Sequence, residues 1–553
     1  MHDVKKSGPH SCWRAVWLAV IGLGTMGTAV AQQAAAEQAA AAAPASASAN
    51  AQAAEAGRHV NVNEYIVRGN TVLDVRSIER AVTPFLGPAR TMKDIEGARD
   101  ALLAAYQAKG YQSVYVDLPE QQVTDGIVVL QVSETRVGRV RVVGAEYNSP
   151  LEVREQVPAL KEGGVPDFTQ AQTELTALNR SAKRQVVPLV RQGAMPGTMD
   201  VDLKVDDSSP WRASVGLNND YSADTKELRA FASLGHDNLW QLGHSASVSF
   251  FGAPQDLNQT QVWSGSYVAP IRGSNWSVEA SGYMSDSNVA TVGGTSVLGK
   301  GHAIGLRGTY TVPDSGAWWH TLSFGVDFKD NEEVTRLGNA GDTVPLKYAP
   351  ITLSYAGFTQ TERGQLGINA ALVAGTRSFL GYGSNWEQFD YKRYKASPSF
   401  LLLKGDTSGT YNFKGNAQLA WRVAAQITDS PLVSSEQIAA GGMNSVRGYL
   451  SAESTGDYGV VGSVEMRSPP LDFFGGVVED WRVYAFADAG QVRLRDPLPE
   501  QESRFSLASV GLGTSFRLAR RVSGRLDLGY PLKAGQRTER HDPRLNFSVT
   551  ASY

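Results

Sequence analysis

Two segments in the last quarter of the chain hold residue types that can form a strong polar contact. Gly441–Tyr449 reads GGMNSVRGY and contains Arg447, while Phe486–Gly490 reads FADAG and contains Asp488. An arginine guanidinium can hold a carboxylate through two parallel hydrogen bonds, which fix position and orientation together. Such a contact positions a segment of chain and requires no catalytic group.

The sequence offers little else for catalysis or metal binding. Gly294–Lys300 has the spacing of a nucleotide-binding loop, but Gly301 stands where that motif requires Ser or Thr, and the segment lies between two expected strands. The eight histidines are scattered without an HExxH motif, and His236 and His244 flank an expected turn, where an interfacial role is favoured over metal binding. We therefore expect no catalytic residue, no metal, no cofactor and no enzyme activity.

Composition excludes several classes of protein. The 553 residues exceed what a single core supports, so several domains are expected. Charged residues make up 19% and hydrophobic residues 42%, which argues against a disordered chain and against a bundle of membrane helices. The net charge of -3 provides no basic field for nucleic acid. Cys12 is the only cysteine and lies in a segment expected to be removed, so neither a disulfide nor a thiolate metal site is expected.

The first 58 residues are typical of an export signal followed by a low-complexity segment. Lysines near the start precede an apolar run at Ala15–Val30, and Ala29–Ala31 matches a small-x-small cleavage site, so residues 1–31 are expected to be a signal peptide. After it, no run reaches the roughly 18 apolar residues of a membrane-spanning helix. Residues 32–58 are rich in alanine and interrupted by Pro44, which leaves a linker and a plug helix both open.

Residues 59–135 and 136–208 predict the same order of elements: strand, helix, helix, strand, strand. In the first segment, apolar residues recur at helical spacing over Thr91–Lys109, and Gly110 ends that helix. In the second, Asp167 is the expected N-cap of a helix. Neither segment has a convergent acid–base set. Their strand edges suit addition of an extended strand from another chain, and a simple spacer is the alternative.

Residues 210–553 change to alternating segments split by Gly, Asp, Asn and Pro. In the last one, every second residue from Leu545 to Tyr553 is apolar and those between are polar, as in a strand that faces lipid on one side and a lumen on the other. We predict a mainly β fold with a transmembrane barrel of sixteen strands, which begin near Arg212, Leu228, Gly243, Thr260, Trp276, Gly301, Trp319, Pro345, Gly364, Tyr394, Lys414, Val460, Arg482, Phe505, Val522 and Arg544.

An even number of strands puts both ends of the barrel on the side of the preceding domains, which is the periplasm. Connections after even-numbered strands should be short, and three candidates are Asp237-Asn238, Arg272-Gly273 and Arg520-Arg521. Trp318 and Trp319 are expected in the aromatic girdle at this rim. Connections after odd-numbered strands face outward, and the longest is the sixth, at about 429–459, which contains Arg447.

Alternation also predicts which way Asp488 points. Val483, Ala485, Ala487 and Ala489 form an apolar face, so Asp488 lies on the opposite one. Because a carboxylate facing lipid at mid-depth is costly, this side chain should point into the lumen.

Together these features resemble the two-partner secretion transporters of the outer membrane, of the haemolysin secretion/activation type, within the superfamily that joins POTRA domains to a barrel. The two upstream repeats are similar to the family's pair of POTRA domains, and the resemblance covers residues from about 59 to 553. Val446, Arg447, Gly448 and Tyr449 match the family's gating-loop motif, and Phe486, Asp488 and Gly490 match its wall motif.

The resemblance implies that Arg447 pairs with Asp488 and holds the sixth outward loop against the inner wall. In a wet lumen such a pair contributes only about 1 kcal/mol, and more where it is dry, which suits a latch better than a permanent strut. Family members often carry an N-terminal helix that plugs the pore, and the short segment 32–58 leaves this point open.

The resemblance also implies the function. The chain is expected to be a monomeric outer-membrane pore, surrounded by lipid, that recognises an unfolded exoprotein in the periplasm through that protein's N-terminal secretion domain and secretes it to the cell surface. One alternative is an outer-membrane protein assembly factor of the same superfamily, which usually has more upstream domains. Another is a diffusion porin, which needs none. Whether the client is an adhesin, a cytolysin or a contact-dependent toxin, and which POTRA residues contact it, is left open.

Overall fold

The computed structural model describes residues 59–179, 183–287, 290–292, 296–298, 300–313, 316–332, 334–337, 340–343, 345–472 and 477–553. The expected signal peptide, the alanine-rich segment and part of Gly294–Lys300 lie outside the described residues. Among the helices described, none combines the length and the apolar character needed to cross a membrane.

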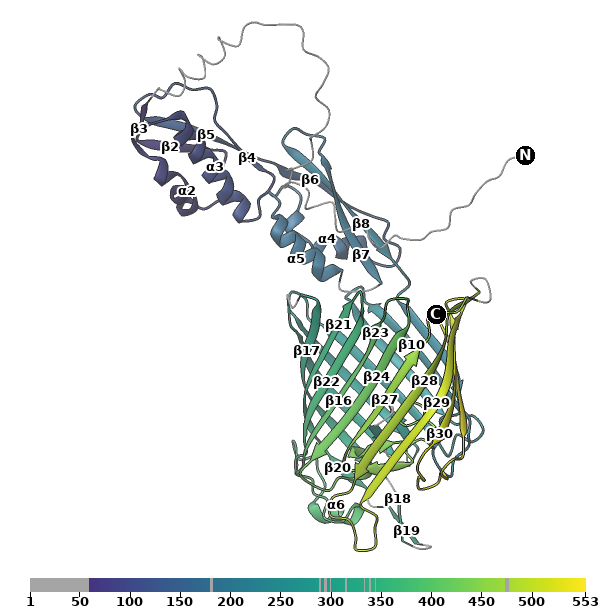
Figure 1. The fold of residues 1–553 in the computed structure, drawn as a ribbon. Coiled ribbons are helices and arrows are strands. Elements are labelled where there is room, and N and C mark those ends of the chain that lie inside the picture. Colours follow the sequence, from purple (N-terminus) through teal and green to yellow (C-terminus); the bar gives the residue numbers. More distant parts are fainter. Residues whose placement is uncertain are drawn as a thin grey trace, which may run out of the picture. The chain divides into compact units, whose positions relative to one another are not determined.

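The first domain has the predicted elements and one further pair of strands (Figure 1). Its elements are β1 (Val60–Val62), β2 (Glu64–Arg68), α2 (Val75–Val82), η1 (Thr83–Phe85), β3 (Gly87–Arg90), α3 (Met92–Ala108), β4 (Val114–Asp117) and β5 (Ile127–Glu134). The sheet has the order β2-β5-β4, and β1 pairs separately with β3. Gly110 has a φ of +89°, which agrees with its predicted place at the end of α3.

The second domain repeats this order. It contains β6 (Arg136–Val143), α4 (Pro150–Glu155), η2 (Pro158–Leu160), α5 (Phe168–Leu178), β7 (Arg184–Gln192) and β8 (Thr198–Asp207). The strands form a sheet in the order β6-β8-β7, with β6 parallel to β8. Asp167 caps α5 as predicted, because its side chain accepts a hydrogen bond of 2.9 Å from the backbone N–H of Gln170. Val153, Leu175 and Leu203 belong to one buried core.

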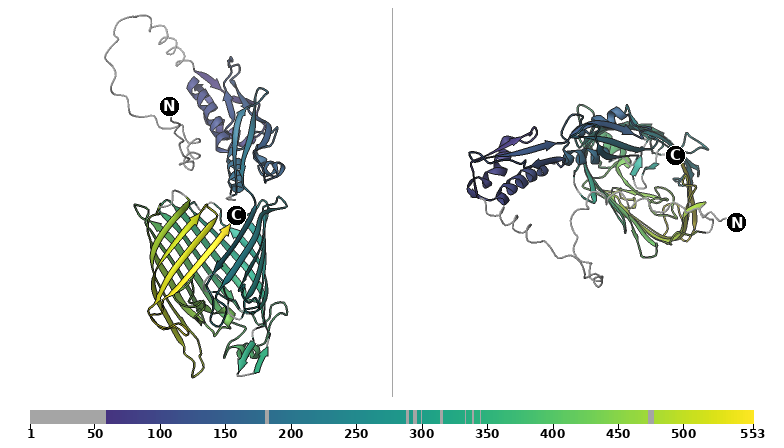
Figure 2. Two further views of the ribbon diagram at one scale, coloured as in Figure 1. Left: turned by 90° about the vertical axis from the view of Figure 1, so that its right-hand side faces the viewer. Right: turned by 90° about the horizontal axis from the view of Figure 1, so that it is seen from above.

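The rest of the chain forms a closed antiparallel barrel (Figures 1 and 2). Pairing between the last strand, β31, and the first, β9, closes it. Its strands are β9 (Trp211–Asn218), β10 (Arg229–Leu239), β11 (His244–Gly252), β12 (Gln261–Pro270), β13 (Trp276–Ser285), β16 (Gly301–Thr311), β17 (Trp318–Asn331), β20 (Leu346–Tyr348), β21 (Ile351–Thr361), β22 (Gly364–Ala374), β23 (Leu401–Asn412), β24 (Gln418–Thr428), β27 (Tyr458–Arg467), β28 (Val478–Arg493), β29 (Arg504–Leu518), β30 (Val522–Pro531) and β31 (Arg544–Ser552).

β20 and β21 are two parts of one strand. Both pair with β17, and Pro350, which has no N–H to donate, lies between them. Counting them together gives the sixteen strands predicted, and the fold class is confirmed. The alternation of β31 is also as expected, since Leu545 is 59% exposed on the outer face and the neighbouring Asn546 is buried.

Three local predictions were wrong. Trp318 shares the outer face with Leu322 and Phe324, but the register of β17 continues without a bulge, so Trp319 points to the lumen side and cannot belong to a lipid-facing girdle. Asp237 and Asn238 belong to β10, which continues to Leu239, so they do not form the turn. The turn follows Leu239 and begins with Trp240, whose φ is positive.

The third error concerns β23, which begins at Leu401 rather than near Tyr394. The intervening residues contain α6 (Trp386–Lys392), which starts with a capping box formed by Asn385 and Gln388. The remaining elements lie in outward connections: β14 (Ala290–Val292), β15 (Ser296–Leu298), β18 (Val334–Leu337), β19 (Ala340–Thr343), η3 (Ser434–Glu436), β25 (Ile438–Ala440) and β26 (Ser454–Gly456).

Candidate functional site

The connection between β24 and β27, residues 429–457, is the predicted sixth outward loop and is called loop 6 below. Most of its residues are buried although it is a connection. Its apolar residues pack on β27, β28 and β29 in a cluster made of Ile438, Ala440, Val446, Tyr449, Val461, Val492 and Leu507. Loop 6 is therefore packed against the inner wall of the barrel.

Glycines allow the backbone of loop 6 to approach the wall closely. Gly448 has a φ of +88°, a conformation that residues with a side chain rarely adopt. A side chain added to Gly529 of β30 would begin 2.5 Å from the backbone nitrogen of Gly448. The two glycines thus form a tight contact that brings the preceding residue, Arg447, against the wall.

All five N–H donors of the Arg447 guanidinium are used. Nε and Nη2 each donate to Asp488 at 2.7 Å, which is the bidentate pairing that the family resemblance implied. Nη1 donates to Glu465 at 2.6 Å and to Asp527 at 3.3 Å, and Nη2 also donates to Ser463 at 2.9 Å. The backbone N–H of Arg447 adds a bond of 3.0 Å to Asp488.

The other residues of the two motifs surround this contact. The guanidinium carbon of Arg447 lies 3.5 Å from the centre of the Phe486 ring, close enough for a cation–π interaction. The Tyr449 hydroxyl lies within hydrogen-bond distance of the carbonyls of Ala508, at 2.9 Å, and Lys533, at 2.8 Å, and its single proton is shared between them. A side chain at Gly490 would begin 3.2 Å from Val446, so this position needs a small residue. The structure brings all seven motif residues together.

The charges around Arg447 balance through direct contacts. Arg525 donates to Glu465 at 2.9 Å and to Asp527 at 2.6 Å, and Arg467 donates to Glu465 at 2.6 Å. Three arginines therefore face three carboxylates: Arg447, Arg467 and Arg525 against Glu465, Asp488 and Asp527.

Of the two cases considered for this pair, wet and dry, the structure has the dry one. Arg447 is 1% exposed and Asp488 is 3% exposed, because loop 6 and the Phe486 ring cover them. Removing one partner from a buried ion pair typically costs about 3–5 kcal/mol, since the other charge is left unpaired. Breaking the Arg447 contact therefore costs more free energy than breaking a surface ion pair, and a new interaction has to offset that cost when loop 6 is released.

Loop 6 has a second attachment, at Glu436, which is 1% exposed. Its carboxylate accepts hydrogen bonds from Lys329 of β17 and from the hydroxyl of Tyr348 at 2.8 Å, and Lys404 of β23 lies at 3.5 Å. Burial alone would raise the pKa of Glu436, but the two ammonium groups and the hydrogen bonds from Lys329 and Tyr348 lower it to about 2. The carboxylate is therefore ionised throughout the physiological range.

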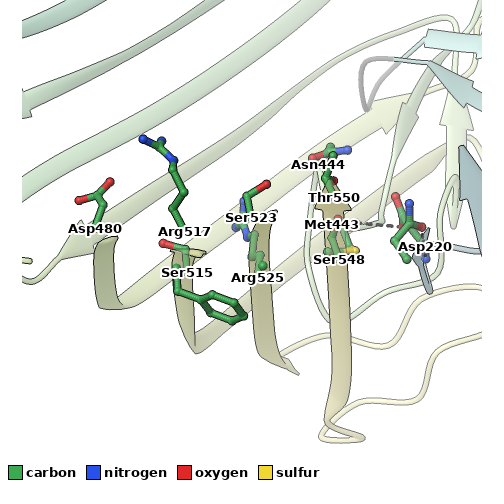
Figure 3. A pocket seen from close by; sticks show the side chains of 13 residues that line it. Asp220, Met443, Asn444, Asp480, Ser515, Arg517, Ser523, Arg525, Ser548 and Thr550 are labelled. Atoms are coloured by element: carbon green, nitrogen blue, oxygen red, sulfur yellow. Dashed lines mark hydrogen bonds between the residues drawn. The ribbon is translucent and has the colours of Figure 1, made fainter. Parts of the chain in front are cut away.

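A cavity of about 290 Å³ lies between the tip of loop 6 and the inner wall (Figure 3). Asn444 of loop 6, Arg517 of β29, Ser523 of β30 and Thr550 of β31 face it. The backbone N–H of Met443 donates to Asp220 at its edge, at 3.0 Å. This space separates the tip of loop 6 from the lumen face of β29, β30 and β31.

Sequence reasoning missed Glu436, Glu465, Ser463, Arg525 and Asp527. Strand alternation would have placed Glu465 and Asp527 on the lumen face, but their closeness to Arg447 depends on the register between strands, which a single sequence does not contain. Glu436 lies in an irregular segment, and Lys329 is 107 positions away from it, so no local pattern indicates the contact.

A closed sixteen-stranded barrel, small N-terminal domains and an inward-folded loop fixed by an arginine together define an outer-membrane transporter of the POTRA-plus-barrel class. The family model described as haemolysin secretion/activation protein ShlB/FhaC/HecB matches residues 197–516, and the POTRA domain model of ShlB type matches residues 60–135. The chain belongs to this ShlB/FhaC/HecB family of two-partner secretion pores, with its barrel in the outer membrane and its POTRA region in the periplasm.

Known relatives agree with this assignment. The chain is 22% identical over 507 residues to the outer membrane transporter CdiB of Escherichia coli, covering 87% of this chain and 80% of the relative. The solved structure of CdiB from Escherichia coli has a TM-score of 0.60 at 19% identity, covering 90% of this chain and 91% of that one. BamA from Haemophilus ducreyi lacking POTRA domains 1-3 shares the fold, with a TM-score of 0.53 at 15% identity, covering 90% of this chain and 100% of that one.

Proposed function

We propose that this chain takes up one large exoprotein by its N-terminal secretion domain and passes it, unfolded, through a monomeric barrel surrounded by outer-membrane lipid. The family assignment carries this proposal. In the second domain, β6 and β7 form the two edges of the sheet, and Leu189 and Val190 of β7 are partly exposed. An extended client segment can add to such an edge through backbone hydrogen bonds. Since the periplasm holds no ATP, folding of the client outside the cell supplies the driving force.

Within this function, loop 6 is the lid of the pore. It is fixed at Arg447 to β27, β28 and β30, and at Glu436 to β17, β20 and β23. We assign the Arg447 contact to the part that opens and the Glu436 contact to a hinge that stays closed. The observation behind this choice is the cavity on the Arg447 side, which gives the loop tip polar space next to the wall.

The test is secretion by an Arg447→Asp variant. Placing a carboxylate among Glu465, Asp488 and Asp527 should expel the loop, so we expect secretion to fall strongly while the barrel still inserts. Arg307→Asp is the matched control, because Arg307 is an arginine of β16 whose carboxylate contact is Glu279 at 3.7 Å rather than a residue of loop 6. Normal secretion by Arg447→Asp would refute the lid.

A deletion separates the export pore from a diffusion porin. We expect the barrel without residues 59–208 to insert and to lose secretion, whereas a porin would conduct ions as before. The exoprotein for these assays should be encoded beside this chain, as a very large protein with an N-terminal secretion domain. Finding that this exoprotein is secreted equally well by the truncated barrel would contradict the proposal.

A further inference from the structure

One arginine of the inner wall takes no part in the contacts described so far. Arg422 lies on β24 and shares the lumen face with Ala420 and Gln426. Within the described residues, no hydrogen bond or ion pair of its side chain is found, in contrast to Arg447, Arg467 and Arg525. Arg422 is partly buried, and a carboxylate partner would offset the cost of removing part of its charge from water.

The position of Arg422 relates it directly to the Arg447 site. It is the cross-strand partner of Ser463, the residue whose hydroxyl accepts from Arg447. Glu465, two residues further along β27, is its diagonal neighbour. Diagonal neighbours in a sheet lie about 7–8 Å apart, a separation that long side chains span. Arg422 can therefore reach Glu465 without any movement of the backbone.

Charges of both signs act on Arg422 while the loop is closed. Glu465 and Asp488 attract its charge, whereas Arg447 and Arg525 repel it. The three carboxylates are already matched by three arginines, because Glu465 accepts from Arg447, Arg467 and Arg525 while Asp488 accepts from Arg447. If Arg447 left, two arginines would face three carboxylates and Ser463 would lose its donor.

Resting on the function proposed above, we propose that Arg422 is a positioning residue that takes the place of Arg447 when loop 6 opens. Its guanidinium moves to Glu465 and Asp488 and restores three cations against three carboxylates. The exchange gives each of the three carboxylates an arginine partner in both states, so the loop can leave a buried ion pair without exposing an unmatched carboxylate. It also delays reclosure, because Arg447 must displace Arg422 to return.

The direct test is the structure of an Arg447→Gln variant of the full chain. This substitution removes the loop's charge but not the loop. We expect Arg422 within hydrogen-bond distance of Glu465 or Asp488, a contact missing from the protein with Arg447. An Arg422 that stays without a carboxylate partner in this variant would overturn the proposal.

A second test needs no change in loop 6. In planar bilayers with potassium chloride as the permeating salt, Arg422→Gln should lower the frequency of openings by about tenfold or more, because no cation replaces Arg447. Arg422→Lys should recover most of it, since a lysine still supplies the charge. Equal opening by Arg422→Gln and the unchanged protein would contradict the exchange. Equal losses in the Gln and Lys variants, with lowered thermal stability, would assign Arg422 a structural role instead.

Failure of this inference is distinguishable from failure of the proposed function. Normal secretion by Arg447→Asp would remove the lid and the exchange together. Blocked secretion by Arg447→Asp combined with an unmoved Arg422 in the Arg447→Gln structure would leave the lid intact and remove only the exchange.

Discussion

Two of the sites at which loop 6 contacts the barrel wall balance their charges differently. At the Arg447 site, three arginines face three carboxylates, and Arg422 is a fourth arginine one strand away. At the Glu436 site, a single carboxylate faces Lys329 and Lys404, which form no other ion pair within the described residues. At the first site, Arg422 can replace the loop's Arg447. At the second site, no carboxylate among the described contacts can replace the loop's Glu436. We infer from this difference that the first opens and the second acts as a hinge.

Disulfide locks should give the largest contrast between the two sites. Val446 of loop 6 and Val461 of β27 lie on the same side of Gly490, each within 3.4 Å of the point where a side chain at Gly490 would begin. A disulfide between cysteines at these positions, V446C/V461C, should therefore hold the Arg447 side of loop 6 against the wall. Asn331 donates to Ser435 at 2.7 Å, so N331C/S435C should lock the hinge. The only native cysteine, Cys12, lies in the expected signal peptide. We expect oxidised V446C/V461C to abolish secretion and oxidised N331C/S435C to retain most of it.

Secretion of the exoprotein, measured by immunoblot before and after reduction, checks this contrast. Reduction should restore export by V446C/V461C, which serves as its own control. If the hinge lock blocked secretion as completely as the other lock, the two sites would not differ and loop 6 would have to leave the wall as a whole.

Asp488→Asn should produce the next largest effect. The amide keeps the shape of the carboxylate but leaves Arg447 without its bidentate partner, at a cost of about 3–5 kcal/mol to the closed state. We expect more frequent openings in planar bilayers and protease cleavage of loop 6. Asp406→Asn is the matched control, because Asp406 faces the lumen from β23 and bonds Asn369 rather than loop 6. Equal conductance in the two variants would contradict the role of Asp488.

Much of the fold could be predicted from the sequence, because strand alternation and turns are local patterns. Arg447 and Asp488 were identified through motifs together with the predicted lumen face of β28. Glu436 and Asp527 could not be found in this way, since their contacts join segments that only closure of the barrel brings together. The helix α6 had a local signal, since Asn385 and Gln388 form a capping box. It was missed because this segment was interpreted as the approach to a strand beginning near Tyr394.

Phe486→Leu should have a moderate effect confined to the Arg447 site. The ring lies under the guanidinium, and a cation–π contact contributes about 0.5–2 kcal/mol, so the ratio of open to closed time should rise between roughly two- and thirtyfold. Phe358→Leu, a change on β21 away from loop 6, is the control. An unchanged ratio for Phe486→Leu would show that the ring only fills space above Gly511.

The smallest of the predicted effects is that of acidification on the Glu436 hinge. The pKa of Glu436 is lowered from 4.5 to about 2, so its stabilising contribution is complete above about pH 4.5 and is lost as the pH falls toward 2. The charged and titratable groups facing it are Lys329, Lys404, Tyr348 and Tyr283 of β13. We expect protease protection of Ser434–Glu436 to be equal at pH 7 and pH 5 and to fall near pH 3, and Glu436→Gln to lack this step. A loss of protection already at pH 5 would contradict an ion-paired hinge.

The movement of loop 6 during export tests the central claim most directly. Spin labels at Asn444 and Ser523, which face the same cavity in the closed protein, should show strong dipolar broadening (Figure 3). With the exoprotein halted in the pore by a stably folded domain fused to its end, we predict that this broadening disappears while a pair at Ser435 and Asn331 keeps its own. Broadening between Asn444 and Ser523 that persists with the halted client would contradict the account.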